Sequence, residues 1–178
     1  VIAPGVVRHT YGNRFELGEP AGGASTRTAT LSGLLEQAGL KAPVSPDIRG
    51  AIWTKLWGNL SFNPVSVLTH ATLDVLATSP RTVPVLRPLL VEAQAIGDKL
   101  GVTFPMDVDA RIAMAQSVGP HKTSMLQDLE RGRPMEIDAL TGVIAEMGRL
   151  VGIATPAVDA VLALTHQRAS SAGRDAKG

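Results

Sequence analysis

The chain has 178 residues, of which 44% are hydrophobic and 19% are charged. This composition excludes a disordered chain, because disordered segments bury too little apolar surface to offset the entropy of ordering. Seventeen Lys and Arg residues against sixteen Asp and Glu residues give a formal net charge of +1, so no basic excess exists to neutralise nucleic-acid phosphates. Cysteine is absent, which excludes disulfide scaffolds, thiolate metal ligands and cysteine nucleophiles. No apolar run approaches the roughly 18 residues of a membrane span. We expect no nucleic-acid or membrane partner and a cytoplasmic location.

The first 20 residues have the pattern of β-structure. Residues 6–10 and 14–17 flank Tyr11-Gly12-Asn13, a sequence that predicts a β-hairpin. A hairpin alone is only marginally stable in water, so we expect these strands to complete a larger sheet. Residues 41–44 predict one further short strand.

From Ser25 onward the pattern is almost wholly helical. Helix start and stop signals, together with apolar periodicity, predict helices over residues 26–38, 45–63, 79–101, 107–118, 123–130, 136–151 and 155–168. The helix over 136–151 has the clearest pattern, with apolar residues at 3-4-3-4 spacing and Gly152 at its end. Residues 169–178 are small and polar, which predicts a disordered tail.

The predicted helix over residues 45–63 lacks the charged face that a surface helix has. It has a bulky apolar face of Ile52, Trp53, Leu56, Trp57 and Leu60, and a face of small residues made of Gly50, Ala51, Thr54, Gly58 and Ser61. Between these faces, Lys55, Asn59 and Asn63 form a polar stripe at spacing i, i+4, i+8. Lys55 is the only charged residue from Gly50 to Asn63. We infer a central helix whose polar stripe lines a cleft.

The polar stripe indicates the chemistry of a small polar substrate. A lysine ammonium provides three donors and a positive charge, and asparagine provides a donor and an acceptor without charge. Together these groups suit a molecule with a carboxylate or carbonyl oxygen and hydroxyl groups. The alternative interpretation is that Lys55 extends into solvent and that Asn59 and Asn63 bond to neighbouring loops.

Two sequence blocks resemble those of a known enzyme family. The first is IWTKLWGN at residues 52–59, followed by Asn63-Pro64. The second is HKTSMLQDL at residues 121–129, followed by EID at residues 136–138. Their content and order resemble the C-terminal domain of ketopantoate reductases (2-dehydropantoate 2-reductases). The resemblance extends over about residues 5–168.

The resemblance implies a mainly α fold: a helical C-terminal domain of the 6-phosphogluconate-dehydrogenase-like type, preceded by a short β-hairpin left from a Rossmann domain. Residues 1–44 would be the end of the nucleotide-binding domain, and residues 45–168 a helical substrate-binding and dimerisation domain, so a homodimer is expected. No Gly-x-Gly-x-x-Gly follows a strand in the 178 residues, so the loop that binds a pyrophosphate is missing. We therefore expect a piece of a longer protein that is inactive alone.

The resemblance also implies an NADPH-dependent reductase of a small 2-oxo acid, most simply of 2-dehydropantoate to pantoate in pantothenate biosynthesis. Lys55 matches the family's catalytic lysine, and Asn59, Asn63 and Ser124 match substrate-binding residues. Glu136 matches the acidic residue near the cofactor and the reaction centre, where it could help to keep Lys55 protonated. Hydride transfer to a 2-oxo carbon puts charge on the ketone oxygen, which Lys55 would stabilise and protonate.

Two departures from the family pattern leave the substrate open. Leu73 and His121 stand where the family has asparagines, so a related dehydrogenase of another small carbonyl compound is an alternative, as is a non-catalytic helical dimerisation module. On local grounds alone, Glu136 complements a helix dipole, and Thr123 or Ser124 is an N-cap. The four histidines are scattered and predict no metal site.

Overall fold

A computed structural model of the chain describes residues 2–9 and 12–172. It divides into two compact units, Val1–Ala51 and Ile52–Gly178. Across the described residues the secondary structure consists of helices and isolated β-bridges, so the predicted mainly α class is confirmed. No described helix is both long and apolar enough to cross a membrane.

Residues 14–17 in the first unit pair with a distant segment rather than with their sequence neighbours. Two parallel bridges join them to residues 41–44, Arg14 with Lys41 and Leu17 with Val44. The predicted hairpin with residues 6–10 is therefore wrong. Residue 10, the end of its predicted first strand, and residue 11, the start of its predicted turn, lie outside the described residues. Parallel pairing needs a long connection, and the helix between the two segments provides it.

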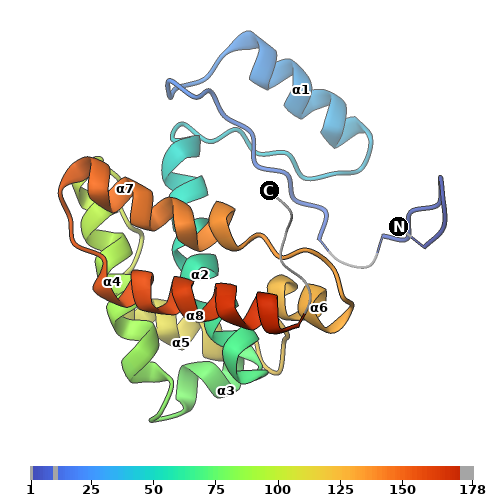
Figure 1. The fold of residues 1–178 in the computed structure, drawn as a ribbon. Coiled ribbons are helices and arrows are strands. Elements are labelled where there is room, and N and C mark those ends of the chain that lie inside the picture. The colour runs from blue at the N-terminus through green and yellow to red at the C-terminus, as the bar shows by residue number, and fades with distance from the viewer. Residues whose placement is uncertain (1, 10–11, 173–178) are drawn as a thin grey trace. The chain divides into compact units, whose positions relative to one another are not determined.

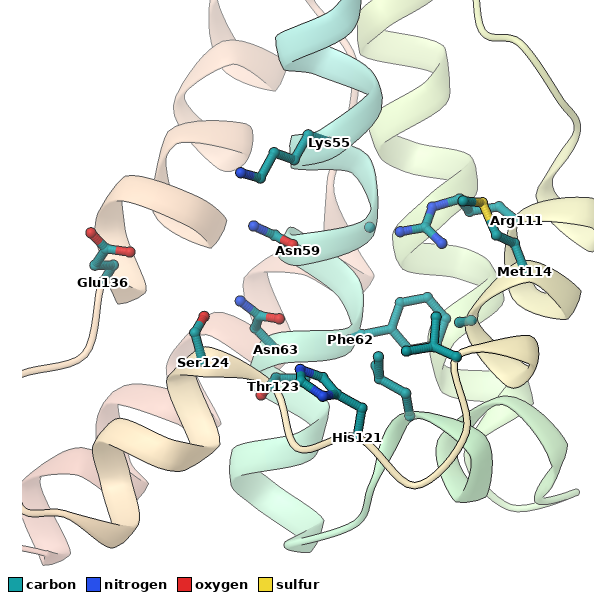
Figure 2. A pocket seen from close by; sticks show the side chains of 14 residues that line it. Lys55, Asn59, Phe62, Asn63, Arg111, Met114, His121, Thr123, Ser124 and Glu136 are labelled. Carbon is teal, nitrogen blue, oxygen red and sulfur yellow. The ribbon is translucent and has the colours of Figure 1, made fainter. Parts of the chain in front are cut away.

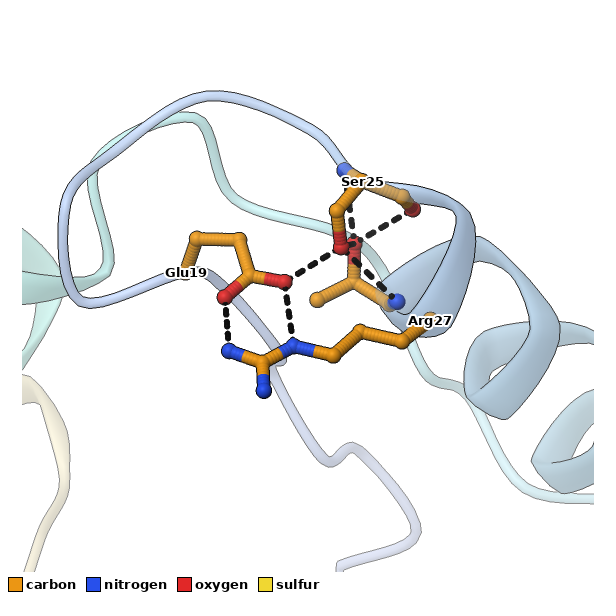
Figure 3. A network of polar contacts seen from close by, with 4 residues as sticks. Glu19, Ser25 and Arg27 are labelled. Carbon is orange, nitrogen blue, oxygen red and sulfur yellow. Dashed lines mark hydrogen bonds and ion pairs between the residues drawn. The ribbon is translucent and has the colours of Figure 1, made fainter.

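That connecting helix, α1 (Thr26–Gln37), begins where the sequence predicts. Ser25 and Thr28 form a capping box, in which each side chain accepts a hydrogen bond from the backbone N–H of the other. The Ser25 hydroxyl also donates to Glu19, whose carboxylate pairs with Arg27 (Figure 3). The hydrogen bond from Arg27, and secondarily the one from Ser25, lower the pKa of Glu19 to about 2. The carboxylate is therefore charged at neutral pH and ties the preceding loop to the start of α1.

The remaining elements are helical and form most of the second unit (Figure 1). They are α2 (Ile48–Thr69), α3 (Leu73–Thr78), α4 (Val83–Lys99), α5 (Val108–Ser117), α6 (Ser124–Glu130), the π-helix η1 (Asp138–Gly142), α7 (Val143–Val151) and α8 (Pro156–Ser171). The short α3 was not expected from the sequence, and α4 begins later than the Ser79-Pro80 signal predicts.

One hydrophobic core joins α2 to α3, α4, α5, α7 and α8. Trp57 of α2 is fully buried, and its indole N–H donates to the carbonyl of Leu90 at 2.8 Å. Its ring centroid lies 4.6 Å from that of Phe104. Ile52 was expected on the same apolar face but is 60% exposed, so the buried face of α2 begins at Trp53.

The bounds of α2 differ from the prediction at both ends. The helix starts at Ile48 rather than at 45 or 46, and the Asp47 carboxylate accepts the Gly50 N–H at 2.9 Å. At the other end the helix continues through Pro64 to Thr69. A proline inside a helix costs about 3 kcal/mol. Burial of the next turn offsets this cost, because Val65 and Val67 are almost completely enclosed and each valine contributes roughly 1.5–3 kcal/mol when buried.

The last two helices also differ from their predicted form. Helical structure begins at Ile137, but the first turn is the π-helix η1 rather than regular α-helix. α8 continues to Ser171 with Ala169 fully buried, so the tail predicted from residue 169 is wrong for residues 169–171. Residues 173–178 lie outside the described part. At its start, α8 is capped from another helix, because the Glu92 carboxylate accepts the backbone N–H groups of residues 157 and 158 at 2.8 and 2.9 Å.

Candidate active site

A pocket of about 490 Å³ lies beside α2 within the second unit (Figure 2). All the residues that the sequence assigned to a site line it: Lys55, Asn59 and Asn63 from α2, Ser124 from the start of α6, and Glu136 from the segment before η1. The structure therefore brings the polar stripe and the second sequence block together in one place. The roles assigned to these side chains stay predictions.

Asn63 is, with Thr123, one of the two most enclosed polar residues of the pocket. It is 4% exposed, and its Nδ2 has no hydrogen-bond partner among the described residues. Its backbone carbonyl accepts the Ser66 hydroxyl at 2.7 Å, and Ser66 in turn lies 2.5 Å from the Thr123 hydroxyl. A buried donor without a partner costs about 1–3 kcal/mol. A polar ligand atom in the pocket would satisfy this donor.

Of the two N-cap candidates that the sequence offers, Thr123 rather than Ser124 caps α6. The Thr123 hydroxyl is the N-cap of α6 and accepts the Leu126 N–H at 3.2 Å. Thr123 is buried, whereas Ser124, the first residue of the helix, is exposed. The Ser124 hydroxyl is not used as the cap and points toward the pocket, as Figure 2 shows.

The charged side chains of this wall do not pair with one another. Lys55 and Glu136 are both exposed, and neither forms an ion pair with another described residue. A direct Glu136–Lys55 pair, which could have kept the lysine protonated, is not formed in this structure. The two side chains approach the pocket from different elements and leave space between them (Figure 2).

The opposite wall contains residues that the sequence did not single out as a group. It includes Phe62, Leu73 and Met114, with Arg111 of α5 as its cation. Arg111 is half-buried, and desolvation lowers the pKa of its guanidinium. A signal for it was present in the sequence. Arg111, Ala115 and Val118 follow helical i, i+4, i+7 spacing, so Arg111 occupies a position of an otherwise apolar stripe.

Known proteins resemble this chain over nearly its whole length. Residues 47–169 match the family model of the ketopantoate reductase PanE/ApbA C-terminal domain. The chain is 57% identical over 173 residues to a 2-dehydropantoate 2-reductase of Mesorhizobium japonicum, an alignment that covers 97% of this chain and 53% of that protein. Across the curated relatives that it matches, the chain spans about half of their length.

Solved structures show the same fold. The 2-dehydropantoate 2-reductase of Methylococcus capsulatus superposes with a TM-score of 0.86 at 34% identity, covering 99% of this chain and 62% of that one. A D-mandelate dehydrogenase in a ternary structure with NADH and anilino(oxo)acetate superposes with a TM-score of 0.82 at 25% identity, covering 94% and 70%. The family model matches more than half of the chain, and the chain therefore belongs to the ketopantoate reductase family, of which it represents the C-terminal domain.

Proposed function

We propose that this chain is the substrate-binding and catalytic C-terminal part of an NADPH-dependent 2-oxo acid reductase that converts 2-dehydropantoate to pantoate. The observation that carries the proposal is the buried Nδ2 of Asn63, which has no hydrogen-bond partner in the described part of the chain, in a pocket that also holds Lys55, Asn59 and Ser124. The Mesorhizobium and Methylococcus relatives, both named 2-dehydropantoate 2-reductase, support it.

In the proposed reaction the 2-oxo acid gains a hydride at C2 and a proton at the ketone oxygen. When bound, the nicotinamide dinucleotide supplies the hydride. The Lys55 ammonium donates a hydrogen bond to the ketone oxygen, stabilises the charge that develops there, and gives up its proton as general acid. Asn59, Asn63 and Ser124 hold the other polar groups of the substrate, because a misplaced substrate loses the rate gain of proximity.

The chain itself contributes little to holding the dinucleotide. Its sequence has no Gly-x-Gly-x-x-Gly after a strand, which is the loop whose backbone N–H groups bind a pyrophosphate. Glu136 fits a narrower role, because its exposed carboxylate at the pocket can accept hydrogen bonds from ribose hydroxyls or a carboxamide. We assign the remaining cofactor contacts to the part of the nucleotide-binding domain that lies outside these 178 residues.

The proposal extends to the organisation of the protein. We assign residues 1–44 to the end of the nucleotide-binding domain and residues 45–168 to a substrate-binding and dimerisation domain of a cytoplasmic homodimer.

Steady-state kinetics of the full-length enzyme that carries this chain test the proposal. With 2-dehydropantoate and NADPH, Lys55→Ala should lower kcat roughly a hundred- to a thousandfold, the usual cost of about 2.7–4 kcal/mol for losing one transition-state donor. The dissociation constant of NADPH should change little. Asn63→Ala should act mainly by raising KM, because it contacts a group whose charge does not change.

Lys122→Ala is the matched control, since that lysine pairs with Glu130 at 2.7 Å and lies outside the pocket. A Lys55→Ala enzyme with near-normal kcat would remove the lysine from the mechanism and favour its extension into solvent.

A panel of other 2-oxo acids should be assayed alongside. Leu73 makes part of the pocket wall apolar where the family has an asparagine, an observation that favours a second candidate, a reductase of a more apolar 2-oxo acid.

A further inference from the structure

We propose that Arg111 is a specificity-determining residue that binds a carboxylate of the substrate, and that the glycine at position 58 creates the space for it. This proposal rests on the 2-oxo acid reductase function given above. Arg111 projects from α5 toward α2, on the side of the pocket opposite Glu136 (Figure 2).

The guanidinium occupies a recess that only glycine leaves open. A Cβ at position 58 would lie 1.6 Å from Nη2 of Arg111 and 2.6 Å from its Cζ. Any other residue at position 58 would therefore displace the guanidinium. Gly58 and Lys55 stand three residues apart on α2, a spacing that places them side by side on the helix surface. The recess thus gives the pocket, which Lys55 also lines, a second cation.

Arg111 has no anionic partner in the described part of the chain. Its printed contact is with the ring of Phe62, whose centroid lies 5.6 Å from Cζ, a cation–π geometry. The acidic residues on its own helix and at that helix's N-cap are engaged elsewhere: Asp109 pairs with Arg87, and Asp107 accepts the N–H of Ala110.

A guanidinium carries five donors and no acceptor, and burial already destabilises the charged form of Arg111. An anion bound in the pocket would neutralise the Arg111 guanidinium and stabilise its charged form. The planar fork of arginine matches a carboxylate in particular, through two parallel hydrogen bonds. Phe62, Leu73 and Met114 make the neighbouring pocket wall apolar, and an ion pair is stronger beside apolar groups than in bulk water.

Two sources could supply this carboxylate. It could be the C1 carboxylate that every 2-oxo acid carries, or a second carboxylate at the far end of a 2-oxo diacid. Both require the same donors from Arg111, but they predict different substrate dependence. If Arg111 binds C1, its loss weakens the binding of all 2-oxo acids. If it binds a distal group, its loss weakens only the binding of diacids.

The test uses Arg111→Met, Arg111→Lys and Gly58→Ala in the full-length enzyme, with 2-oxoisovalerate as monoacid and 2-oxoglutarate as diacid. Losing hydrogen bonds to a charged group should raise KM roughly ten- to a hundredfold, with a smaller effect on kcat. Arg111→Lys should recover part of the loss. Gly58→Ala keeps the charge but moves the guanidinium, so it should resemble Arg111→Met. The matched control is Arg87→Met, which removes an arginine outside the pocket.

Binding of oxamate, a non-reducible 2-oxo acid analogue, by calorimetry separates this proposal from the reductase function, because it needs no turnover. Weaker oxamate binding in Arg111→Met than in the wild type supports the C1 assignment even if no substrate is reduced. Unchanged oxamate binding together with unchanged KM for both acids overturns the role of Arg111. If Arg111→Met binds oxamate more weakly than the wild type but Gly58→Ala binds it equally well, the role of the recess is overturned. Circular dichroism and Tm confirm that each variant is folded.

Discussion

At the residue scale, the pocket concentrates groups that the protein alone does not satisfy. Within the described ranges 2–9 and 12–172, the Asn63 Nδ2 is a buried donor without a hydrogen-bond partner, and Arg111 is a half-buried cation without an anionic partner. The surroundings of Asn63 are nevertheless rigid, because Ser66 bonds both to its carbonyl and to Thr123 of the next sequence block. Groups held in place and left unsatisfied are prepared for a ligand, since their ordering cost is met during folding.

Asn63→Leu should therefore stabilise the unliganded protein while it abolishes substrate affinity. Removing an unpartnered buried donor should raise the free energy of unfolding by about 1 kcal/mol, as measured by urea denaturation. Ser66→Ala is the control, because that buried hydroxyl is partnered, and its loss should lower the free energy of unfolding by about 1 kcal/mol. Destabilisation by Asn63→Leu would mean that the amide nitrogen is satisfied in solution.

At the element scale, local signals predicted helices well where the determining contacts are local. Ser25, Asp107 and Thr123 each cap a helix that the sequence predicted to begin at that residue or at the next one, because a capping hydroxyl or carboxylate acts within three residues. Pro64 shows the limit of such signals. It normally ends a helix, yet burial of the following turn, including Val65, keeps α2 intact.

Long-range contacts explain the other differences from the predicted elements. The hairpin prediction was wrong because residues 14–17 pair with residues 41–44. A local hairpin pattern contains no information about a pairing segment that lies beyond an intervening helix. Arg111 went unrecognised because an arginine on a short helix is normally a solvated residue. The place of its guanidinium depends on Gly58 of another helix, and no local pattern connects the two residues.

The cap of α8 illustrates this dependence on distant residues and leads to a test. Glu92 of α4 accepts two backbone N–H groups at the start of α8. Its carboxylate thus satisfies donors that the helix leaves open and complements the helix dipole. Glu92→Ala should lower the free energy of unfolding by about 0.5–2 kcal/mol in urea denaturation, and Glu92→Gln, which keeps one acceptor oxygen, by less. Equal stability of all three proteins would show that the contact contributes nothing.

At the scale of the whole molecule, the candidate site is assembled from segments far apart in sequence. Lys55 and Asn63 share a helix, and their common stripe was visible from spacing alone. Ser124 and Glu136 carry no local pattern that distinguishes a site from a cap or a helix start. Their place in the pocket was expected only because two sequence blocks resembled one family. Spacing therefore predicts one wall of the pocket, and tertiary packing determines the rest.

This assembly predicts that the 178-residue chain will bind a 2-oxo acid analogue but will not reduce a 2-oxo acid with NADPH. In the sequence, all the pocket residues fall in the range 55–136. The chain therefore contains the proposed substrate contacts. The Gly-rich loop is absent from the sequence, and a single carboxylate cannot replace the backbone donors that hold a pyrophosphate. Purified chain should therefore bind oxamate in calorimetry and show no NADPH oxidation with 2-dehydropantoate, whereas full-length enzyme at equal concentration turns over. Turnover by the chain that persists after rigorous removal of any full-length enzyme would contradict this division of roles, because dinucleotide binding would then reside within these helices.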